Sequence, residues 1–423
     1  MAVLNVFDDV RRSCRRAIVY PAAFSLVLNV LALTIPLYMM QVYDRVLGSR
    51  NTDTLLFLTL IGIGALLAFA ALDWVRARML VRIGNWVERS LAPEAFARAL
   101  EAQLQGYPYR GEALQDIAQL RNFLTGPTLL CFFDAPWSPI YLLVIFLLHP
   151  ALGAVALAGA LALSGLAMLN EMTTRERLRE ANWNQIANAR NAEDALRNAE
   201  VIDAMGMLGP IVARWRMQSE RVITDQEVAS DRSGVIASTS RFVRLALQMG
   251  MLGLGAYLVL DRDMTPGGMI GGSLILARAL SPIEQAILTW RQLIGARQAY
   301  QRLVTFFERD RLRERRTSLP VPNGRLDIER VVHAFPKAEH ALLKGIGFSV
   351  PAGTSLALIG SSGSGKTTLA RILVGVLKPV SGVARLDGAD VFSWSREDFG
   401  RHVGYLPQDV ELFGGSIREN IAS

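Results

Sequence analysis

The chain has 423 residues, of which 51% are hydrophobic, and a mean hydropathy of +0.27. These values argue against a soluble enzyme and favour a membrane protein of two or three domains. The net charge of +7 does not indicate a nucleic-acid partner, because the excess is almost all arginine in the connections between apolar runs. Cys14 and Cys131 lie far apart and indicate neither a disulfide framework nor a zinc site.

Apolar segments in the first two thirds of the chain predict six membrane-spanning helices, since one span needs about 20 residues. Between Arg121 and Glu171 only Asp134 is ionised, and His149-Pro150 is a natural break between two helices there. The first run is too long for a cleavable signal peptide and more spans follow it, so we expect none. The expected spans are Ala17–Tyr43, Thr54–Leu72, two between Arg121 and Glu171, Leu245–Leu260 and Met264–Ala277.

Basic residues are divided unequally between the connections of these spans. The second and fourth connections are long and rich in Ala, Arg and Glu, which predicts that they prolong the membrane helices. Both termini and these connections are expected on the cytoplasmic side, because positive charge is retained there. The second connection contains Arg76, Arg78, Arg82, Arg89, Arg98, Arg110 and Arg121, the fourth contains nine arginines from Arg175 to Arg232, and the odd-numbered connections contain only Arg45, Arg50 and Arg262.

The composition changes after the sixth span. A charged stretch from Glu308 to Arg316 leads to Pro320 and Pro322. From there on, short β-like runs and turn signals such as Asp387-Gly388 replace the long apolar helices. We therefore expect an all-α membrane domain of six helices over residues 1–315 and part of an α/β domain over residues 316–423.

The octapeptide Gly360–Thr367 matches the phosphate-binding pattern G-x-x-x-x-G-K-[ST] at every fixed position. An apolar run, Thr354–Ile359, predicts a buried strand before it, and apolar residues at helical spacing from Leu369 to Leu377 predict a helix after it. Such a loop surrounds phosphates with backbone N–H groups at a helix N-terminus, while Lys366 adds a charge and the Thr367 hydroxyl can ligate Mg²⁺. The expected nucleotide-binding residues are Gly360, Ser361, Ser362, Gly363, Ser364, Gly365, Lys366, Thr367 and Thr368.

Six spans with long helical connections, followed by a phosphate loop, resemble an ABC exporter half-transporter. The resemblance implies ATP and Mg²⁺ as cofactors and adds two site residues. Phe335, 25 positions before Gly360, stands where the family places an aromatic side chain that stacks on adenine. Gln408 matches the glutamine of the family's Q-loop, which contacts Mg²⁺ and the attacking water, and is therefore the expected catalytic residue.

Within ABC exporters, three stretches are similar to the protease- and lipase-exporting group of bacterial type I secretion systems: Tyr38–Val46, Phe133–Pro139 and Arg278–Gln285. The similarity implies a homodimer in the bacterial inner membrane, in contact with membrane lipid, that exports proteins by using ATP. It further implies a periplasmic adaptor and an outer-membrane channel as partners. The exported substrates would be unfolded proteins with an uncleaved C-terminal signal.

The sequence departs from this family at its end, because Ser423 follows shortly after the Q-loop region. The signature sequence of the LSGGQ type, the acidic Walker B pair and the switch histidine are not among the 423 residues. We therefore expect a truncated chain that cannot turn over ATP, from a full-length parent that hydrolyses it. Two alternatives stay open: an exporter of lipid, drug or peptide on the same scaffold, and a non-catalytic remnant.

Two membrane features also have open interpretations. Asp134 is either a functional charge within the membrane or a group at headgroup level beside the interfacial Trp137. The small residues Gly267, Gly268, Gly271 and Gly272 allow close helix packing, and a role in a translocation pathway is the second interpretation.

Overall fold

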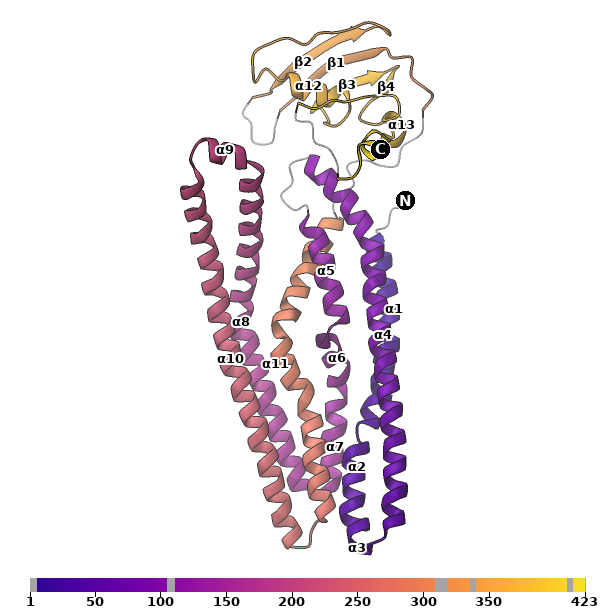
Figure 1. Ribbon diagram of the computed structural model, residues 1–423, viewed down its shortest axis with the longest axis vertical. Coiled ribbons are helices and arrows are strands. Elements are labelled where there is room, and N and C mark those ends of the chain that lie inside the picture. The colour runs from indigo at the N-terminus through magenta and orange to yellow at the C-terminus, as the bar shows by residue number, and fades with distance from the viewer. Residues whose placement is uncertain (1–5, 105–110, 309–318, 335–339, 409–413, 423) are drawn as a thin grey trace. The chain divides into compact units, whose positions relative to one another are not determined.

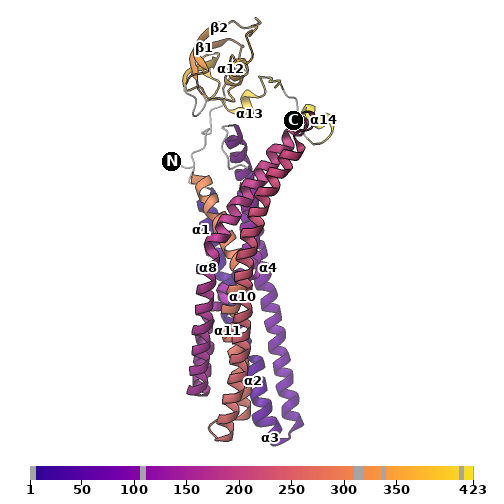
Figure 2. The same ribbon diagram turned by 90° about the vertical axis from the view of Figure 1, so that its left-hand side faces the viewer.

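The structure is a computed structural model that describes residues 6–104, 111–308, 319–334, 340–408 and 414–422. Its internal contacts divide the chain into two compact units, Met1–Phe96 with Gly111–Glu308, and Ala97–Arg110 with Arg309–Ser423. The first unit consists of long helices, and the second contains a small sheet with short helices (Figures 1 and 2). The domain boundary expected after residue 315 lies outside the described residues and stays a prediction.

The first expected span, Ala17–Tyr43, is not a single helix in the structure. It consists of α1 (Val6–Leu31), α2 (Thr34–Gln41), the π-helical turn η1 (Val42–Val46) and α3 (Leu47–Ser49). The helix breaks at residues 32–33 because Pro36 has no N–H to donate to the carbonyl four residues earlier.

Long helices form most of the first unit. The expected prolongation of the membrane helices into the connections is confirmed, since single helices continue far beyond the apolar runs. Figures 1 and 2 show α8 and α10 side by side, joined by the short α9. These elements are α4 (Thr52–Leu104), α5 (Glu112–Thr125), α8 (Pro150–Arg197), α9 (Ala199–Ala204), α10 (Leu208–Leu260) and α11 (Pro266–Glu308).

The third and fourth spans are separated where the sequence indicated. The third comprises α6 (Pro127–Asp134), the 3₁₀ turn η2 (Ala135–Trp137) and α7 (Ser138–Leu148). The fourth begins with α8 at Pro150, whose fixed φ suits the first turn of a helix. His149 caps that helix, because its Nδ1 accepts the N–H of Ala151 at 3.2 Å.

Among the described residues, five segments are long and apolar enough to cross a membrane. The sixth expected span, Met264–Ala277, lies at the start of α11 and does not reach the same hydropathy. Its glycines are buried against other helices: a Cβ on Gly271 would lie 2.5 Å from Met40 Cγ. Close packing, the first interpretation of these glycines, therefore describes their environment in the structure. The five segments are Val6–Ser49, Thr52–Leu104, Pro127–Leu148, Pro150–Arg197 and Leu208–Leu260.

Asp44 in the π-helical turn η1 holds the N-terminus of α11. Its Oδ1 accepts the N–H of Gly267 at 2.7 Å, and its Oδ2 accepts the Thr265 hydroxyl at 2.8 Å. Thr265 Oγ1 in turn accepts the N–H of Gly268 at 3.1 Å. The carboxylate thereby satisfies orphan donors of the first turn and complements the helix dipole.

The second unit contains a four-stranded antiparallel sheet in the order β2-β1-β3-β4. The expected Asp387-Gly388 turn is confirmed as the two-residue connection of β3 and β4, with φ of 49° and 84° as a type I′ turn requires. Leu369 and Ile372 of α12 pack with Ile328, Val331 and Ala384 of the sheet. The elements are β1 (Leu326–His333), β2 (Leu343–Val350), α12 (Lys366–Leu373), β3 (Ser381–Leu386), β4 (Ala389–Asp390), α13 (Arg396–Phe399) and α14 (Ile417–Ala422).

The expected buried strand Thr354–Ile359 is wrong for this structure. These residues have no regular secondary structure and are exposed, with Leu356 at 50% and Ile359 at 92%. An apolar run becomes a buried strand only when neighbouring strands accept its hydrogen bonds and cover its faces. The strands of the described residues pair only with one another, and none lies beside this run.

Candidate nucleotide-binding site

The phosphate-binding loop depends on glycine at three positions. Gly360, Gly363 and Gly365 have φ of 157°, 82° and 93°, values that side chains with a Cβ rarely adopt. These conformations turn the chain sharply from the irregular residues before Gly360 into α12, which begins at Lys366. The loop therefore ends at a helix N-terminus, where free N–H groups and the helix dipole favour an anion.

Gly365 also brings the loop close to the sheet. A Cβ at this position would lie 2.8 Å from Leu343 Cδ2 at the start of β2 and 3.3 Å from Leu342 Cγ. Leu343 is buried in the core of this unit, at 3% exposure. The first turn of α12 is thus held against a rigid element, which fixes the direction of its N-terminal N–H groups.

Lys366 lies across the loop from which it extends. Its Nζ donates to the carbonyl oxygens of Gly360 and Ser361, both at 2.8 Å, and lies 3.5 Å from Ser364 Oγ. These acceptors are uncharged, and no ion pair is formed by Lys366 within the described part of the chain. A polyphosphate would be a better acceptor for this ammonium group than neutral carbonyl oxygens, because opposite charges attract.

The other expected site residues differ in their environment. Thr367 is exposed in the first turn of α12, whereas Thr368 is 9% exposed and packs into the core. Gln408 is exposed in irregular backbone and makes no hydrogen bond to the loop. Phe335 lies outside the described residues, so its role stays a prediction. Gly360–Thr367 therefore form one continuous loop, while the roles of Gln408 and Phe335 stay predictions.

Metal binding by protein side chains alone is not indicated in the described residues. They contain no group of three or more His, Cys, Asp or Glu side chains that could hold a metal ion. Mg²⁺ does not need such a group, because it retains water and takes phosphate oxygens as ligands. The exposed Thr367 hydroxyl, at the end of the phosphate loop, is suited to be its protein ligand.

The far end of α12 is fixed by residues that the sequence analysis did not identify. Gly375, with φ of 64°, donates its N–H to Ile372 O, and Val376 N–H donates to Arg371 O, which together form a Schellman motif. Arg396 then donates to Val374 O at 2.6 Å and also to the Gly375 and Val391 carbonyls. The helix expected up to Leu377 ends earlier, at Leu373, and Gly375 inside the expected range was the available signal for this end. No signal indicated Arg396.

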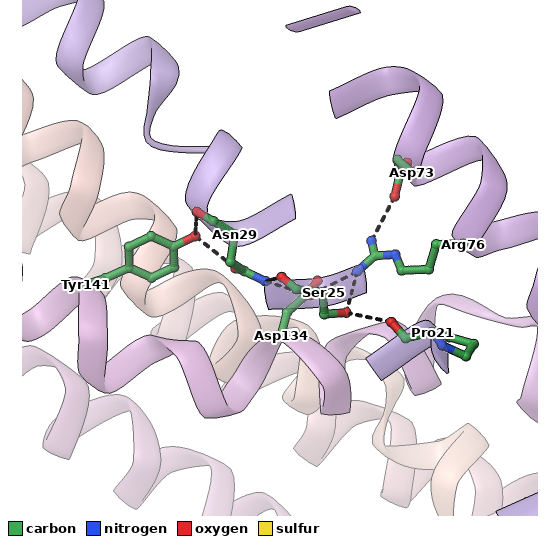
Figure 3. A network of polar contacts seen from close by, with 7 residues as sticks. All are labelled: Pro21, Ser25, Asn29, Asp73, Arg76, Asp134 and Tyr141. Atoms are coloured by element: carbon green, nitrogen blue, oxygen red, sulfur yellow. Dashed lines mark hydrogen bonds and ion pairs between the residues drawn. The ribbon is translucent and has the colours of Figure 1, made fainter. Parts of the chain in front are cut away.

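A polar network in the helical unit determines the environment of Asp134 (Figure 3). Arg76 of α4 donates from Nη1 to Asp134 Oδ1 at 3.0 Å and to Ser25 Oγ at 2.9 Å, and from Nη2 to Asp73 Oδ1 at 2.8 Å. The Arg76 side chain is 7% exposed and that of Asp134 is 29% exposed. Asp134 is therefore paired inside the helical unit, and both interpretations of its position in the membrane stay open.

Asn29 extends this network to a further helix. Its Nδ2 donates to Asp134 Oδ1 at 3.1 Å, while the Tyr141 hydroxyl donates to Asn29 Oδ1 and to Asn29 O, both at 2.8 Å (Figure 3). The network joins α1, α4, α6 and α7. Ser25 and Asn29, one helical turn apart in an otherwise apolar run, were its signal in the sequence.

Family models of known proteins match residues in both units of the chain. Residues 19–281 match the model of the ABC transporter transmembrane region, and residues 343–423 match the ABC transporter model. The chain belongs to the ABC transporter family. Its helical unit is the membrane-spanning part and its phosphate loop lies in the ATP-binding part of this family, as the sequence predicted.

Several ABC transporters are similar to the chain over nearly its whole length. The type I secretion system ATP-binding protein PrsD of Rhizobium meliloti (strain 1021) is 38% identical over 418 residues, which cover 97% of the chain and 71% of PrsD. The cyclolysin secretion/processing ATP-binding protein CyaB of Bordetella pertussis (strain Tohama I) is 24% identical over 94% of the chain. The alpha-hemolysin translocation ATP-binding protein HlyB of Escherichia coli O157:H7 is 23% identical over 96% of the chain.

The chain is shorter than these ABC transporters, spanning 57% of CyaB and 58% of HlyB. A solved structure of a bacterial Atm1-family ABC exporter with ATP bound has a TM-score of 0.75, with 97% of the chain and 74% of the exporter covered. At 21% identity, this likeness shows the ABC exporter fold alone.

Proposed function

We propose that the chain is the membrane permease and ATP-binding part of a bacterial type I secretion system that exports proteins. The observation that carries this proposal is the 38% identity with PrsD, which extends over both the membrane-spanning part and the phosphate loop. CyaB is named for the secretion of cyclolysin and HlyB for the translocation of alpha-hemolysin, which supports a protein cargo.

The proposed location is the bacterial inner membrane, with both termini and the long helical extensions in the cytoplasm. Two copies would form the pathway as a homodimer, next to a periplasmic adaptor and an outer-membrane channel. The arginine-rich second and fourth connections support this orientation, because they form the long extensions of α4, α8 and α10.

In the ATP site, the backbone N–H groups from Gly363 to Lys366 and the Lys366 ammonium group would bind the phosphates. Thr367 and Gln408 would contribute oxygen ligands to Mg²⁺, which when bound neutralises phosphate charge. Phe335 would stack on adenine. Hydrolysis needs an acidic residue and a signature sequence in addition, so we expect the 423 residues alone to bind MgATP without turning it over.

Nucleotide binding tests this assignment directly. Lys366→Ala removes the charge-assisted hydrogen bonds to phosphate, each worth about 1.5–3 kcal/mol, so we expect affinity for a fluorescent ATP analogue to fall about 10- to 100-fold. Lys344→Ala, at an exposed lysine of β2, is the matched control and keeps the affinity of the parent chain. Equal affinities of the two variants would refute the ATP site.

Secretion tests the class of cargo. With Lys366→Ala introduced into the chromosomal gene, a reporter that carries a C-terminal secretion signal is expected to remain in the cell, whereas Lys344→Ala permits its export. If both strains export the reporter equally while the purified Lys366→Ala protein has lost ATP binding, the protein-export proposal fails and the ATP site stands.

A further inference from the structure

Exposed arginines gather at one end of α1 and α4. On α1 they precede the uncharged run that begins at Ala17, and on α4 they follow the apolar run that ends at Leu72. All are exposed, and none pairs with a carboxylate among the described residues. We call this set the arginine band: Arg11, Arg12, Arg15 and Arg16 of α1 with Arg78, Arg82 and Arg89 of α4.

On α4 the arginine band alternates with tryptophan. Trp74, Arg78, Arg82, Trp86 and Arg89 follow one another at spacings of four, four, four and three residues, which places them within about 120° of the helix circumference. Trp74 and Trp86 are 60% and 41% exposed, and the Arg78 guanidinium lies 5.1 Å from the Trp74 ring centroid. Exposed tryptophan with arginine is typical of the membrane–water interface.

The two parts of the arginine band lie on the same side of a hydrogen bond between α1 and α4. The bond from Arg76 Nη1 to Ser25 Oγ fixes the antiparallel register of α1 and α4. From this bond, Arg15 is about 15 Å further along α1, and Arg82 and Trp86 are about 9 and 15 Å further along α4, at 1.5 Å per residue. The two parts of the arginine band therefore overlap along the helix axis, with the α4 part extending from about 3 Å at Arg78 to about 20 Å at Arg89 beyond this bond.

The adjacent part of α4 exposes an apolar surface that is suited to contact with lipid. None of its most apolar window is buried inside the chain, and Phe57, Ile61 and Leu67 are 63%, 70% and 67% exposed. A second copy of the chain is a poorer occupant at the arginine band itself, because an isologous contact there would oppose like charges.

Exposed arginines elsewhere in the same unit are paired differently. On α8 and α10, Arg179, Arg197 and Arg216 each lie within 3.5 Å of a glutamate oxygen one turn away on the same helix. On α1, Asp8 and Asp9 lie one turn from Arg11 and Arg12. The three arginines of α4, Arg78, Arg82 and Arg89, have no carboxylate three or four positions away on their own helix. The positive charge of these three is therefore open to an anion from outside the chain.

We propose that the arginine band binds the headgroups of anionic phospholipids. Their phosphates and further negative charges would accept hydrogen bonds from the guanidinium groups, while the acyl chains lie along the exposed apolar surface of α4. With the proposed orientation, this is the cytoplasmic leaflet, and the site is separate from the one for ATP.

Native mass spectrometry of the purified chain tests this proposal. The protein in detergent is given equal amounts of phosphatidylglycerol and phosphatidylcholine with identical acyl chains, and the bound lipids are counted. We expect preferential retention of phosphatidylglycerol, and a drop of that preference by at least about tenfold in Arg78→Gln/Arg82→Gln/Arg89→Gln, because each arginine near an anionic surface contributes about fivefold.

Two further variants keep the test decisive. Replacing the same three arginines by lysine retains the charge and is expected to retain the preference. Arg179→Gln/Arg197→Gln/Arg216→Gln removes equally many exposed arginines from α8 and α10 and is expected to change nothing. The proposal is overturned if the wild-type chain binds both lipids equally, if the glutamine variant of the arginine band keeps the preference, if the lysine variant loses it, or if the α8 and α10 variant loses as much.

Discussion

Two cationic side chains show how differently the two units use a positive charge. Arg76 is buried in the helical unit and lies between the carboxylates of Asp73 and Asp134, at 2.8 and 3.0 Å. Lys366 is accessible at the phosphate loop and has only neutral oxygens as partners, the Gly360 and Ser361 carbonyls at 2.8 Å. The first charge is already compensated within the protein, whereas the second is held in place without compensation.

This difference separates a structural site from a binding site. A buried charge with two carboxylate partners has little to gain from a ligand and much to lose when a partner is removed. A cation that bonds only to carbonyl oxygens can exchange them for phosphate at a gain. Substitutions at the two sites are therefore expected to affect different properties: stability at Arg76 and affinity for nucleotide at Lys366.

The largest expected effect on stability is that of Arg76→Met. It leaves Asp134 and Asp73 without their shared partner, and breaking a buried ion pair costs about 3 kcal/mol. We expect a clear drop in the thermal unfolding midpoint of the detergent-solubilised chain, measured by circular dichroism, with ATP affinity unchanged at low temperature. Arg78→Met is the control, since Arg78 is exposed two residues away, and we expect it to shift stability by no more than about 0.5 kcal/mol.

If both variants unfold at the same temperature, the network of Figure 3 is not a stabilising element and the comparison with Lys366 loses its basis.

A smaller effect is expected from alanine in the phosphate loop. Gly365→Ala forces an L-residue to φ of 93° and brings its Cβ to 2.8 Å from Leu343 Cδ2. We expect it to cost about 2 kcal/mol and to abolish high-affinity binding of a fluorescent ATP analogue. Gly363→Ala at φ of 82°, where a Cβ would meet nothing within 4 Å, is expected to cost about half as much. Equal losses would show that the contact with β2 does not position the loop.

The sequence was sufficient for features that depend on local chemistry. Pro150 after His149 fixed the break between two spans, and the Asp387-Gly388 pair fixed a two-residue hairpin. The pattern of Gly360–Thr367 located the loop in the same way, since its glycines are required by backbone conformation. In each of these places, neighbouring residues alone determine the structure.

Features that depend on distant partners could not be obtained in this way. The apolar run Thr354–Ile359 has the composition of a strand, but a strand also needs neighbours to bond with. The partner of Asp134 is Arg76, 58 positions away, which the sequence presented only as one of many basic residues in a connection. The glycines from Gly267 to Gly272 lower the hydropathy of the sixth span, and the contacts of Gly271 with Met40 of α2 and of Gly267 with Asp44 are not revealed by periodicity.

Asp44 extends the comparison to a charge that stabilises backbone dipoles. Asp44→Ala removes the acceptor for Gly267 N–H and the Thr265 hydroxyl, and the loss of such a cap costs about 1 kcal/mol. We expect faster hydrogen exchange in the first turn of α11, measured by mass spectrometry, without a change at α12. Asp53→Ala, at an exposed aspartate in the first turn of α4, is the control. Exchange that is equally fast at α11 in both variants would exclude the role of Asp44 as a cap.

The smallest effect concerns Asp387, the counterpart of Asp44 in the ATP-binding unit. Its carboxylate accepts the backbone N–H groups of Gly324 at 3.0 Å, Arg325 at 3.1 Å and Asn323. These hydrogen bonds, that of Gly324 first, hold the pKa of Asp387 below its ordinary value. A carboxylate with a lowered pKa stabilises the folded state above the pKa of the unfolded chain, about 3.9, and this stabilisation disappears as the pH falls through the lower folded value.

Asp387→Asn should therefore be less stable than the parent chain at pH 7 and approach it below about pH 4, since the parent loses its advantage there. Thermal unfolding of both proteins from pH 7 to pH 3 measures this difference. Glu397→Gln, at an exposed carboxylate of α13, is the control and is expected to keep a constant offset from the parent. A constant offset for Asp387→Asn as well would mean that its charge, unlike that of Asp44, contributes nothing to the loop that it contacts.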